Sequence, residues 1–179
     1  MLVQEKTGLI VIDVQGKLAR IVHNSEKLAA NLEKLIRGCQ LLSIPIIWAE
    51  QNPKGLGTTI PELEKLLQHQ KPVEKFSFNA LDNEDFKKVI INSGKKQWLI
   101  CGIEAHICVY QTAMGLLSKN FEVEIVADCV SSRSEESIVI ALQKLQHKGA
   151  SLTNIEMCLY ELVKDSRREI FKEILTLIK

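Results

Sequence analysis

Three reactive side chains, Asp13, Lys75 and Cys108, lie at or just beyond the ends of predicted strands. Asp13 ends the first apolar run of the chain, Lys75 ends the third predicted strand, and Cys108 follows the fourth by about one turn. The carboxyl ends of parallel strands meet at one edge of a sheet, so we expect the three side chains to come within hydrogen-bond or ion-pair range. A carboxylate, a cation and a thiol suit acyl transfer, in which the thiol attacks a carbonyl carbon and the carboxylate accepts its proton.

Each of the three residues also has a simpler interpretation when it is taken alone. An Asp at a strand end is often a turn or helix cap, a single Lys is usually a solvated charge, and a Cys in an apolar helix is usually part of the core. Cys108 is predicted to lie in the first turn of a helix over residues 106–120, where the helix dipole should favour an anion and lower the thiol pKa. The shared position at one sheet edge favours the catalytic interpretation.

The elements that must position these residues alternate between short apolar runs and longer amphipathic segments. Such alternation predicts an α/β fold: a three-layer, doubly wound, open parallel sheet of about six strands with helices on both faces. The segment 51–59 contains one proline and two glycines and is predicted to be a loop. The predicted strands are residues 8–14, 45–49, 72–75, 97–101, 122–127 and 150–153, and the predicted helices are residues 24–43, 61–68, 82–93, 106–120, 134–149 and the segment from 155 onward.

Composition narrows the class of protein. The chain has 179 residues and a net charge of +1, which gives no electrostatic case for nucleic acid or for a membrane surface. The apolar run before Asp13 is too short for a signal sequence or a membrane span, which favours a cytoplasmic location. The five cysteines are odd in number and form no CxxC pair, so they predict neither a disulfide framework nor a zinc ribbon.

Five stretches of sequence carry a resemblance to a known family. They are LIVIDVQ (9–15), AEQNPKGLGTTIPEL (49–63), KFSFNA (75–80), ICGIEAHICVYQTA (100–113) and VADCVSSRS (126–134). Together they resemble the isochorismatase-like cysteine hydrolases, a family that includes nicotinamidases and N-carbamoyl amidohydrolases. The likeness is closest to the branch called isochorismatase domain-containing hydrolases.

The resemblance implies one hydrolase domain over residues 1–179 and a covalent mechanism. Asp13 would be the base, Lys75 would hold it ionised, and Cys108 would form a thioester with a small amide, carbamoyl or related acyl substrate. The backbone N–H groups of Glu104 and Cys108 would stabilise the oxyanion, and the peptide bond between Ile103 and Glu104 would be cis. No cofactor is implied, and the family resemblance points to a homo-oligomer.

Further residues are candidates for contact with the substrate. Trp48 and Phe78 could line an apolar pocket or belong to the core, and His106 could orient the substrate or face solvent. The polar residues after the second strand could bind substrate or satisfy loop backbone. The predicted substrate-binding set is Gln15, Glu50, Gln51, Phe78 and His106.

Two departures from the family pattern shape the expected chemistry. Metal-dependent nicotinamidases carry histidines in the loop after the second strand, whereas here no histidine follows that strand until His69. We therefore expect no catalytic metal. Ala105 also stands where many relatives have threonine, which removes a hydroxyl from the pocket wall.

Two alternative functions remain open at this point. One is isochorismatase-type acid catalysis on the same fold, which would not need the thiol of Cys108. The other is a catalytically vestigial scaffold that binds a partner. The C-terminal segment 155–179 is predicted to be helical with many apolar residues, part of which would meet another subunit.

Overall fold

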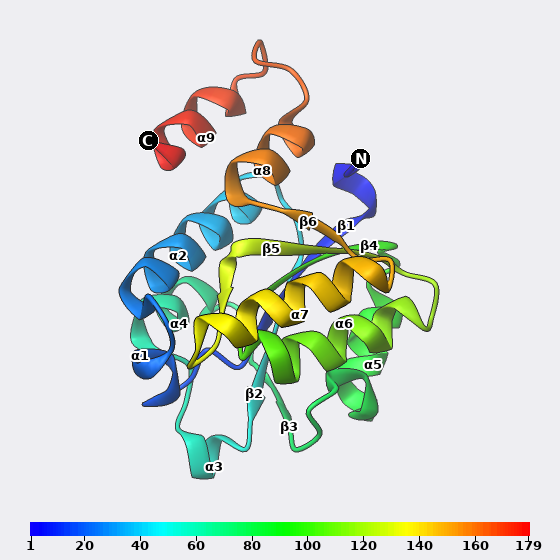
Figure 1. Cartoon of the computed structure of the whole chain (residues 1–179). Helices are drawn as coiled ribbons and strands as arrows, with labels where there is room; N and C mark the ends of the chain where they lie inside the picture. The colour runs from blue at the N-terminus through cyan, green and yellow to red at the C-terminus, as the bar shows by residue number, and fades with distance from the viewer.

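A six-stranded parallel sheet forms the centre of the computed structural model, which describes residues 1–179 (Figure 1). The strands lie in the order β3-β2-β1-β4-β5-β6, with every neighbouring pair parallel. This arrangement confirms the predicted open, doubly wound α/β sheet. The strands are β1 (Thr7–Ile12), β2 (Ile46–Gln51), β3 (Val73–Lys75), β4 (Gln97–Ile103), β5 (Glu122–Ser131) and β6 (Ser151–Thr153).

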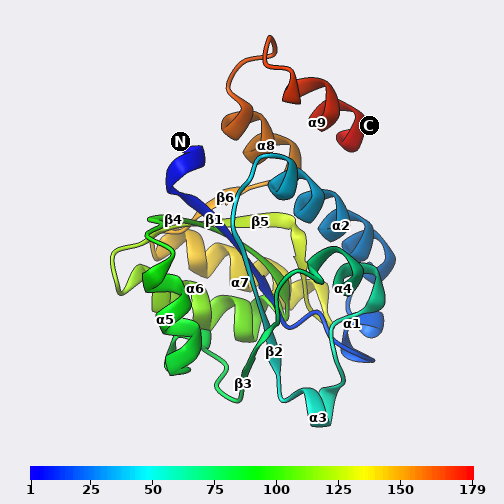
Figure 2. The ribbon, with the colours of Figure 1, turned by 180° about the vertical axis from the view of Figure 1, so that it is seen from behind.

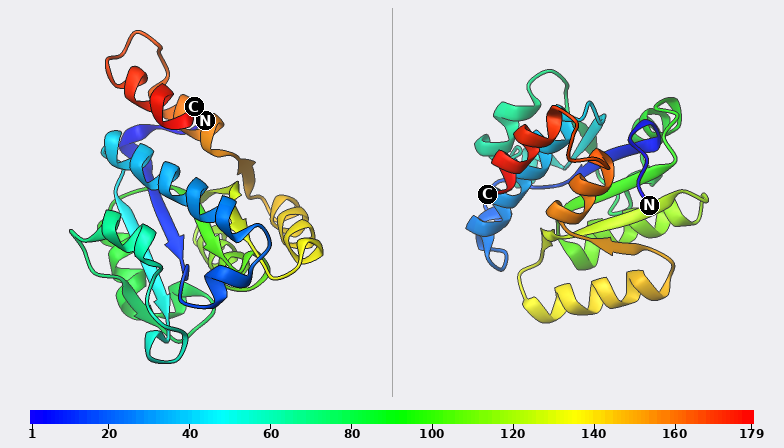
Figure 3. Two further views of the ribbon diagram at one scale, coloured as in Figure 1. Left: turned by 90° about the vertical axis from the view of Figure 1, so that its left-hand side faces the viewer. Right: turned by 90° about the horizontal axis from the view of Figure 1, so that it is seen from above.

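Helices cover both faces of the sheet. From behind, α5 and α6 lie on one side of the strands and α2 and α4 on the other (Figure 2). Seen from above, α2 and α9 again lie on the opposite side from α7 (Figure 3). The α-helices are α1 (Leu18–Ile21), α2 (Ser25–Leu41), α3 (Pro53–Leu56), α4 (Pro61–Leu67), α5 (Glu84–Asn92), α6 (Tyr110–Leu117), α7 (Glu135–His147), α8 (Ile155–Val163) and α9 (Ile170–Ile178). Short 3₁₀ turns span Gln4–Lys6 and Ala80–Asp82, and a π-helix spans Ala105–Val109.

Alternate side chains of the central strands belong to two separate cores. Leu9 and Val11 of β1 pack in the core formed with α2, α4 and α8. Ile10 and Ile12 pack in the core formed with α5, α6 and α7. Because both faces of β1 are buried, neither face needs polar side chains, and this explains its continuous apolar run.

The direction in which strands are added changes between β1 and β4. From β1 the sheet grows through β2 to β3 on one side, and from β4 through β5 to β6 on the other. In open α/β sheets, ligand sites form outside the carboxyl ends of the strands at such a switch point. Asp13 follows β1 directly, and Cys108 lies in the π-helix that follows β4.

Several local predictions differ from the structure. The predicted helix over residues 106–120 is a π-helix followed by the shorter α6. The predicted loop over residues 51–59 contains α3, and the C-terminal segment forms two helices, α8 and α9, rather than one. Residue Lys164, at the end of α8, has φ of 65°, a conformation that interrupts a right-handed helix. None of the helices combines the length and apolarity needed to cross a membrane.

Candidate active site

A buried ion pair between Lys75 and Asp13 lies at the carboxyl edge of the sheet. Lys75 Nζ donates to Asp13 Oδ2 at 2.6 Å, and the two side chains are 0% and 5% exposed. The same ammonium donates to Gln51 Oε1 at 2.9 Å and to the Ser77 carbonyl oxygen at 3.3 Å. An ammonium has three N–H donors, so these acceptors satisfy all of them. Lys75 is therefore held against one oxygen of Asp13.

The second carboxylate oxygen of Asp13 has a different environment. Asp13 Oδ1 is buried and has no hydrogen-bond partner in the protein. Burial raises the pKa of Asp13 above its ordinary value, while Lys75 acts in the opposite direction by charge and by hydrogen bonding. Asp13 also has φ of 51°, a left-handed conformation that is uncommon for a residue other than glycine. A carboxylate with a free oxygen and a raised pKa is a suitable general base.

The thiol of Cys108 lies beside this carboxylate, and the residue is only 7% exposed. Burial raises the pKa of Cys108 to about 12, and the negative charge of Asp13 adds to the effect. The prediction that the helix start lowers this pKa was wrong. The cost of burying a thiolate exceeds the dipole effect, which falls off within a helix turn. With its pKa raised in this way, Cys108 is a neutral thiol at neutral pH.

Asp13 and Cys108 share a small cavity. Its volume is about 110 Å³, and six of its ten lining residues are hydrophobic. The structure therefore brings Asp13, Lys75 and Cys108 together as their strand-end positions predicted, although Lys75 lies behind Asp13 rather than in the cavity wall. The lining residues are Asp13, Gln15, Leu18, Gln51, Leu56, Phe78, Ile103, Glu104, Ile107 and Cys108.

The two glutamines in the cavity wall also hold neighbouring segments in place. Gln15 Nε2 donates to the carbonyl oxygens of Gly57 and Gln51 at 2.6 and 3.2 Å, and Gln15 Oε1 accepts the Gln51 N–H at 2.6 Å. Gln51 Nε2 donates to the Phe76 carbonyl oxygen at 2.6 Å. Through these bonds Gln15 fastens the 51–59 segment to the end of β1, and Gln51 links Lys75 to the chain that follows β3.

Three other candidate residues lie outside the cavity wall. Glu50 is buried, and its Oε1 accepts from the N–H and the hydroxyl of Thr59 at 2.6 and 2.7 Å. His106 Nδ1 is 2.9 Å from Ser132 Oγ, and its ring lines a separate hollow beside α7. Trp48 is 4% exposed and packs in the core beneath α2. The structure gives no support to a substrate contact for any of them.

The turn after β4 carries the predicted oxyanion donors. The Ile103–Glu104 peptide bond is cis, as the family resemblance implied. The backbone N–H of Glu104 makes none of the backbone hydrogen bonds found in loops and helix caps. The side-chain carboxylate of Glu104, by contrast, accepts from the backbone N–H and the Nε of Arg133 at 3.0 and 3.1 Å.

Sequence reasoning missed several residues of this site. Arg133 stands in the VADCVSSRS stretch, but nothing there indicated that it binds Glu104. Leu18, Leu56 and Ile107 line the cavity, yet an apolar residue in a loop or short helix carries no sequence signal of a pocket wall. No group of three or more His, Cys, Asp or Glu side chains is placed to hold a metal ion.

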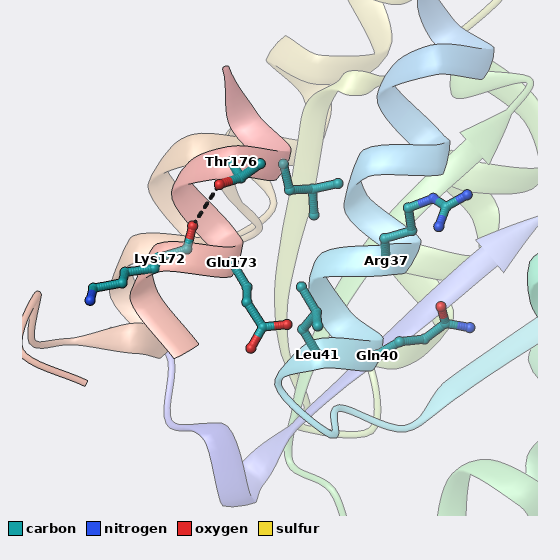
Figure 4. A pocket seen from close by; sticks show the side chains of 7 residues that line it. Arg37, Gln40, Leu41, Lys172, Glu173 and Thr176 are labelled. Atoms are coloured by element: carbon teal, nitrogen blue, oxygen red, sulfur yellow. Dashed lines mark hydrogen bonds between the residues drawn. The ribbon is translucent and has the colours of Figure 1, made fainter. Parts of the chain in front are cut away.

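A larger hollow of about 830 Å³ lies between α2 and α9 (Figure 4). Its wall includes Arg37, Gln40 and Glu173, and the Thr176 hydroxyl donates to the Lys172 carbonyl oxygen at 2.9 Å. The helix α9 is at the opposite end of the molecule from α3 (Figure 1). This hollow contains no thiol and no buried charge pair, so the smaller cavity is the candidate active site.

Comparison with known proteins places this geometry in a family. A model of the isochorismatase domain matches residues 7–157. Isochorismatase domain-containing protein 2 of Danio rerio is 38% identical over 170 residues, which cover 95% of this chain and 85% of that protein.

Solved structures agree with this match. The MAR1 ribonuclease of Caenorhabditis elegans is 34% identical, with a TM-score of 0.91 over 99% of this chain and 91% of that one. The YcaC protein of Escherichia coli, described as an octameric hydrolase of unknown specificity, is 26% identical, with a TM-score of 0.94 over 99% of this chain and 88% of that one. With its fold, its domain match and these relatives in agreement, the chain belongs to the isochorismatase family of hydrolases.

Proposed function

We propose that this chain is a metal-independent cysteine hydrolase that cleaves a small amide, carbamoyl or related acyl substrate through a thioester on Cys108. One observation carries the proposal: Asp13 is bound to Lys75 by one oxygen, keeps its other oxygen unpaired, and shares a small cavity with Cys108. A base, a nucleophile and a cation that fixes the base are the parts that covalent acyl transfer needs.

The first half-reaction forms the acyl-enzyme. Asp13 accepts the Cys108 proton as the sulfur attacks the carbonyl carbon, so the neutral thiol loses its proton during the attack. The N–H groups of Glu104 and Cys108 stabilise the oxyanion, a contribution of about 3 kcal/mol for each such donor. The tetrahedral intermediate then collapses, the carbon–nitrogen bond breaks, and Asp13 returns the proton to the leaving amine.

The second half-reaction releases the acid. Asp13 accepts a proton from a water molecule that attacks the thioester, and the departing sulfur takes that proton back as the carbon–sulfur bond breaks. Lys75 takes no part as an acid because its three N–H groups are bound to Asp13, Gln51 and the Ser77 carbonyl. Its role is to keep Asp13 ionised and oriented.

A screen of small amides and carbamoyl compounds tests this proposal, with Cys108→Ala as the control. We expect hydrolysis by the native chain, loss of hydrolysis in Cys108→Ala, and an acyl adduct on Cys108 by mass spectrometry of quenched reactions. Activity that survives in Cys108→Ala would favour isochorismatase-type acid catalysis instead.

The screen and a measurement of thiol reactivity separate the remaining alternatives. A vestigial site would show no hydrolysis in the screen, and Cys108 would react with iodoacetamide no faster than the four fully buried thiols. An RNA substrate belongs in the screen because the Caenorhabditis elegans relative is named a ribonuclease. The net charge of +1 and the 110 Å³ cavity do not favour RNA here.

We also propose that the chain forms a homo-oligomer, because the Escherichia coli relative is described as octameric. Sedimentation velocity at micromolar concentration should show a species larger than the 20.2 kDa monomer. A monomer alone would contradict this proposal. The absence of a catalytic metal is tested by measuring the metal content of the active protein and by adding a chelator. We expect no stoichiometric metal and no change in activity.

A further inference from the structure

The charged side chains in the cavity wall are both acidic. Asp13 and Glu104 line the cavity, and no Lys, Arg or His side chain lines it with them. The other lining residues are two glutamines, the thiol of Cys108 and apolar side chains. A substrate with a carboxylate beside its acyl group would therefore meet like charge and find no cation to pair with.

The nearest cations are already bound to these two carboxylates. Lys75 is fully buried, and its ammonium is used by Asp13, Gln51 and the Ser77 carbonyl. Arg133 donates its Nε to Glu104 at 3.1 Å, outside the cavity wall. Lys75 cannot turn toward a ligand without leaving the buried Asp13 carboxylate unpaired, which is costly. The Arg133 side chain is 60% exposed and does not line the cavity.

The size of the cavity sets a second limit. The cavity has a volume of only about 110 Å³. Sites for drug-sized ligands usually measure about 300–1,000 Å³. Leu56 of α3 and Phe78 after β3 line the cavity while remaining 44% and 53% exposed, so they stand at its mouth.

From this charge and size we infer that the site selects small acyl groups without charge, and that Leu56 and Phe78 set the upper limit of their size. The inference rests on the proposed function, because it takes Cys108 as the nucleophile. It excludes dianionic substrates such as isochorismate itself and carbamoyl compounds with a free carboxylate on the acyl side.

Alkylation of the native protein tests the charge selection without a known substrate. Iodoacetamide and iodoacetate have nearly the same shape and differ in charge. Their rates of reaction with Cys108 are measured by peptide mass spectrometry and divided by the rates with 2-mercaptoethanol, a neutral free thiol. We expect the normalised ratio to favour iodoacetamide by about tenfold or more.

The outcomes distinguish this inference from the proposed function. An equal normalised ratio, or a preference for iodoacetate, overturns the charge selection while Cys108 remains a reactive nucleophile. No reaction of Cys108 with either reagent overturns the proposed nucleophile, and the inference falls with it.

The size limit is tested with iodoacetanilide, a bulkier neutral reagent. Phe78→Ala and Leu56→Ala should each raise its rate relative to iodoacetamide by several-fold because the mouth is widened. Phe76→Ala is the matched control, since Phe76 is 76% exposed and lies outside the cavity wall. Equal effects of Phe76→Ala and Phe78→Ala, or no effect of Phe78→Ala and Leu56→Ala, would refute the size limit.

Discussion

Replacing Lys75 with methionine removes the ammonium while keeping a side chain of similar length. Asp13 would then be a buried carboxylate without a cationic partner, since Lys75 is the cation that pairs with it. Removing one member of a buried ion pair costs about 3–5 kcal/mol. Both side chains are almost fully buried, at 0% and 5% exposed, so solvent screens this interaction little. For a chain of this size, each kcal/mol lowers the melting temperature by about 2–4 °C, which predicts a fall of roughly 6–20 °C.

The penalty should depend on pH in a defined direction. Burial already raises the pKa of Asp13, and loss of Lys75 raises it further. A carboxyl group with a raised pKa in the folded state stabilises that state when protonated, and this contribution is lost as the pH rises through the raised pKa. The destabilisation caused by Lys75→Met should therefore be largest at neutral pH. It should become smaller as the pH falls toward the ordinary Asp range, because Asp13 is then protonated and carries no buried charge. The double variant Asp13→Asn with Lys75→Met removes both charges and should recover most of the loss.

Urea unfolding at about pH 7 and about pH 5 measures these differences. Lys88→Met is the matched control, because Lys88 is 67% exposed and pairs only with the exposed Asp85. That control should change the free energy of unfolding by less than about 0.5 kcal/mol. The reasoning fails if Lys75→Met is as stable as Lys88→Met at neutral pH. It also fails if the double variant loses as much as the two single variants added together.

Three further predictions concern the site and its supports. The acid limb of the pH profile of kcat/KM should lie above the ordinary Asp range, because Asp13 must be ionised and burial raises its pKa; a limb at the ordinary value would contradict this. Gln51→Ala should lower kcat by about tenfold to a hundredfold with little change in KM, since it removes an acceptor from Lys75. Gln51→Glu should restore kcat in part because it keeps an acceptor there. Equal losses in both variants would contradict the role of Gln51 in positioning Lys75. Gly102→Ala should destabilise the fold far more than Gly94→Ala, as measured by urea unfolding. Both glycines have positive φ, but a Cβ at Gly102 would collide with the backbone oxygen of β1, whereas nothing lies within 4 Å of one at Gly94; similar losses would refute the steric argument.

Much of the fold and the positions of the main reactive residues could be read from the sequence. The apolar run of β1 indicated a strand buried on both faces, and helices between the strands indicated parallel crossovers. Chain connectivity then placed Asp13, Lys75 and Cys108 at one edge of the sheet, since all parallel strands end on the same side. These features depend on local periodicity and on topology, which a sequence expresses directly.

Tertiary structure decided the charge state and the partners of those residues. Burial raises the pKa of Cys108, although its place in the chain suggested a lowered one, because desolvation depends on neighbours distant in sequence. The position of Glu50 near the end of a strand predicted a place in the site. Its carboxylate instead accepts hydrogen bonds from the N–H and the hydroxyl of Thr59, in the 51–59 segment that folds back against β2. His106 similarly faces Ser132 rather than the cavity. Strand order fixes which ends of the chain meet, but only packing determines which atom of each side chain is left free for chemistry.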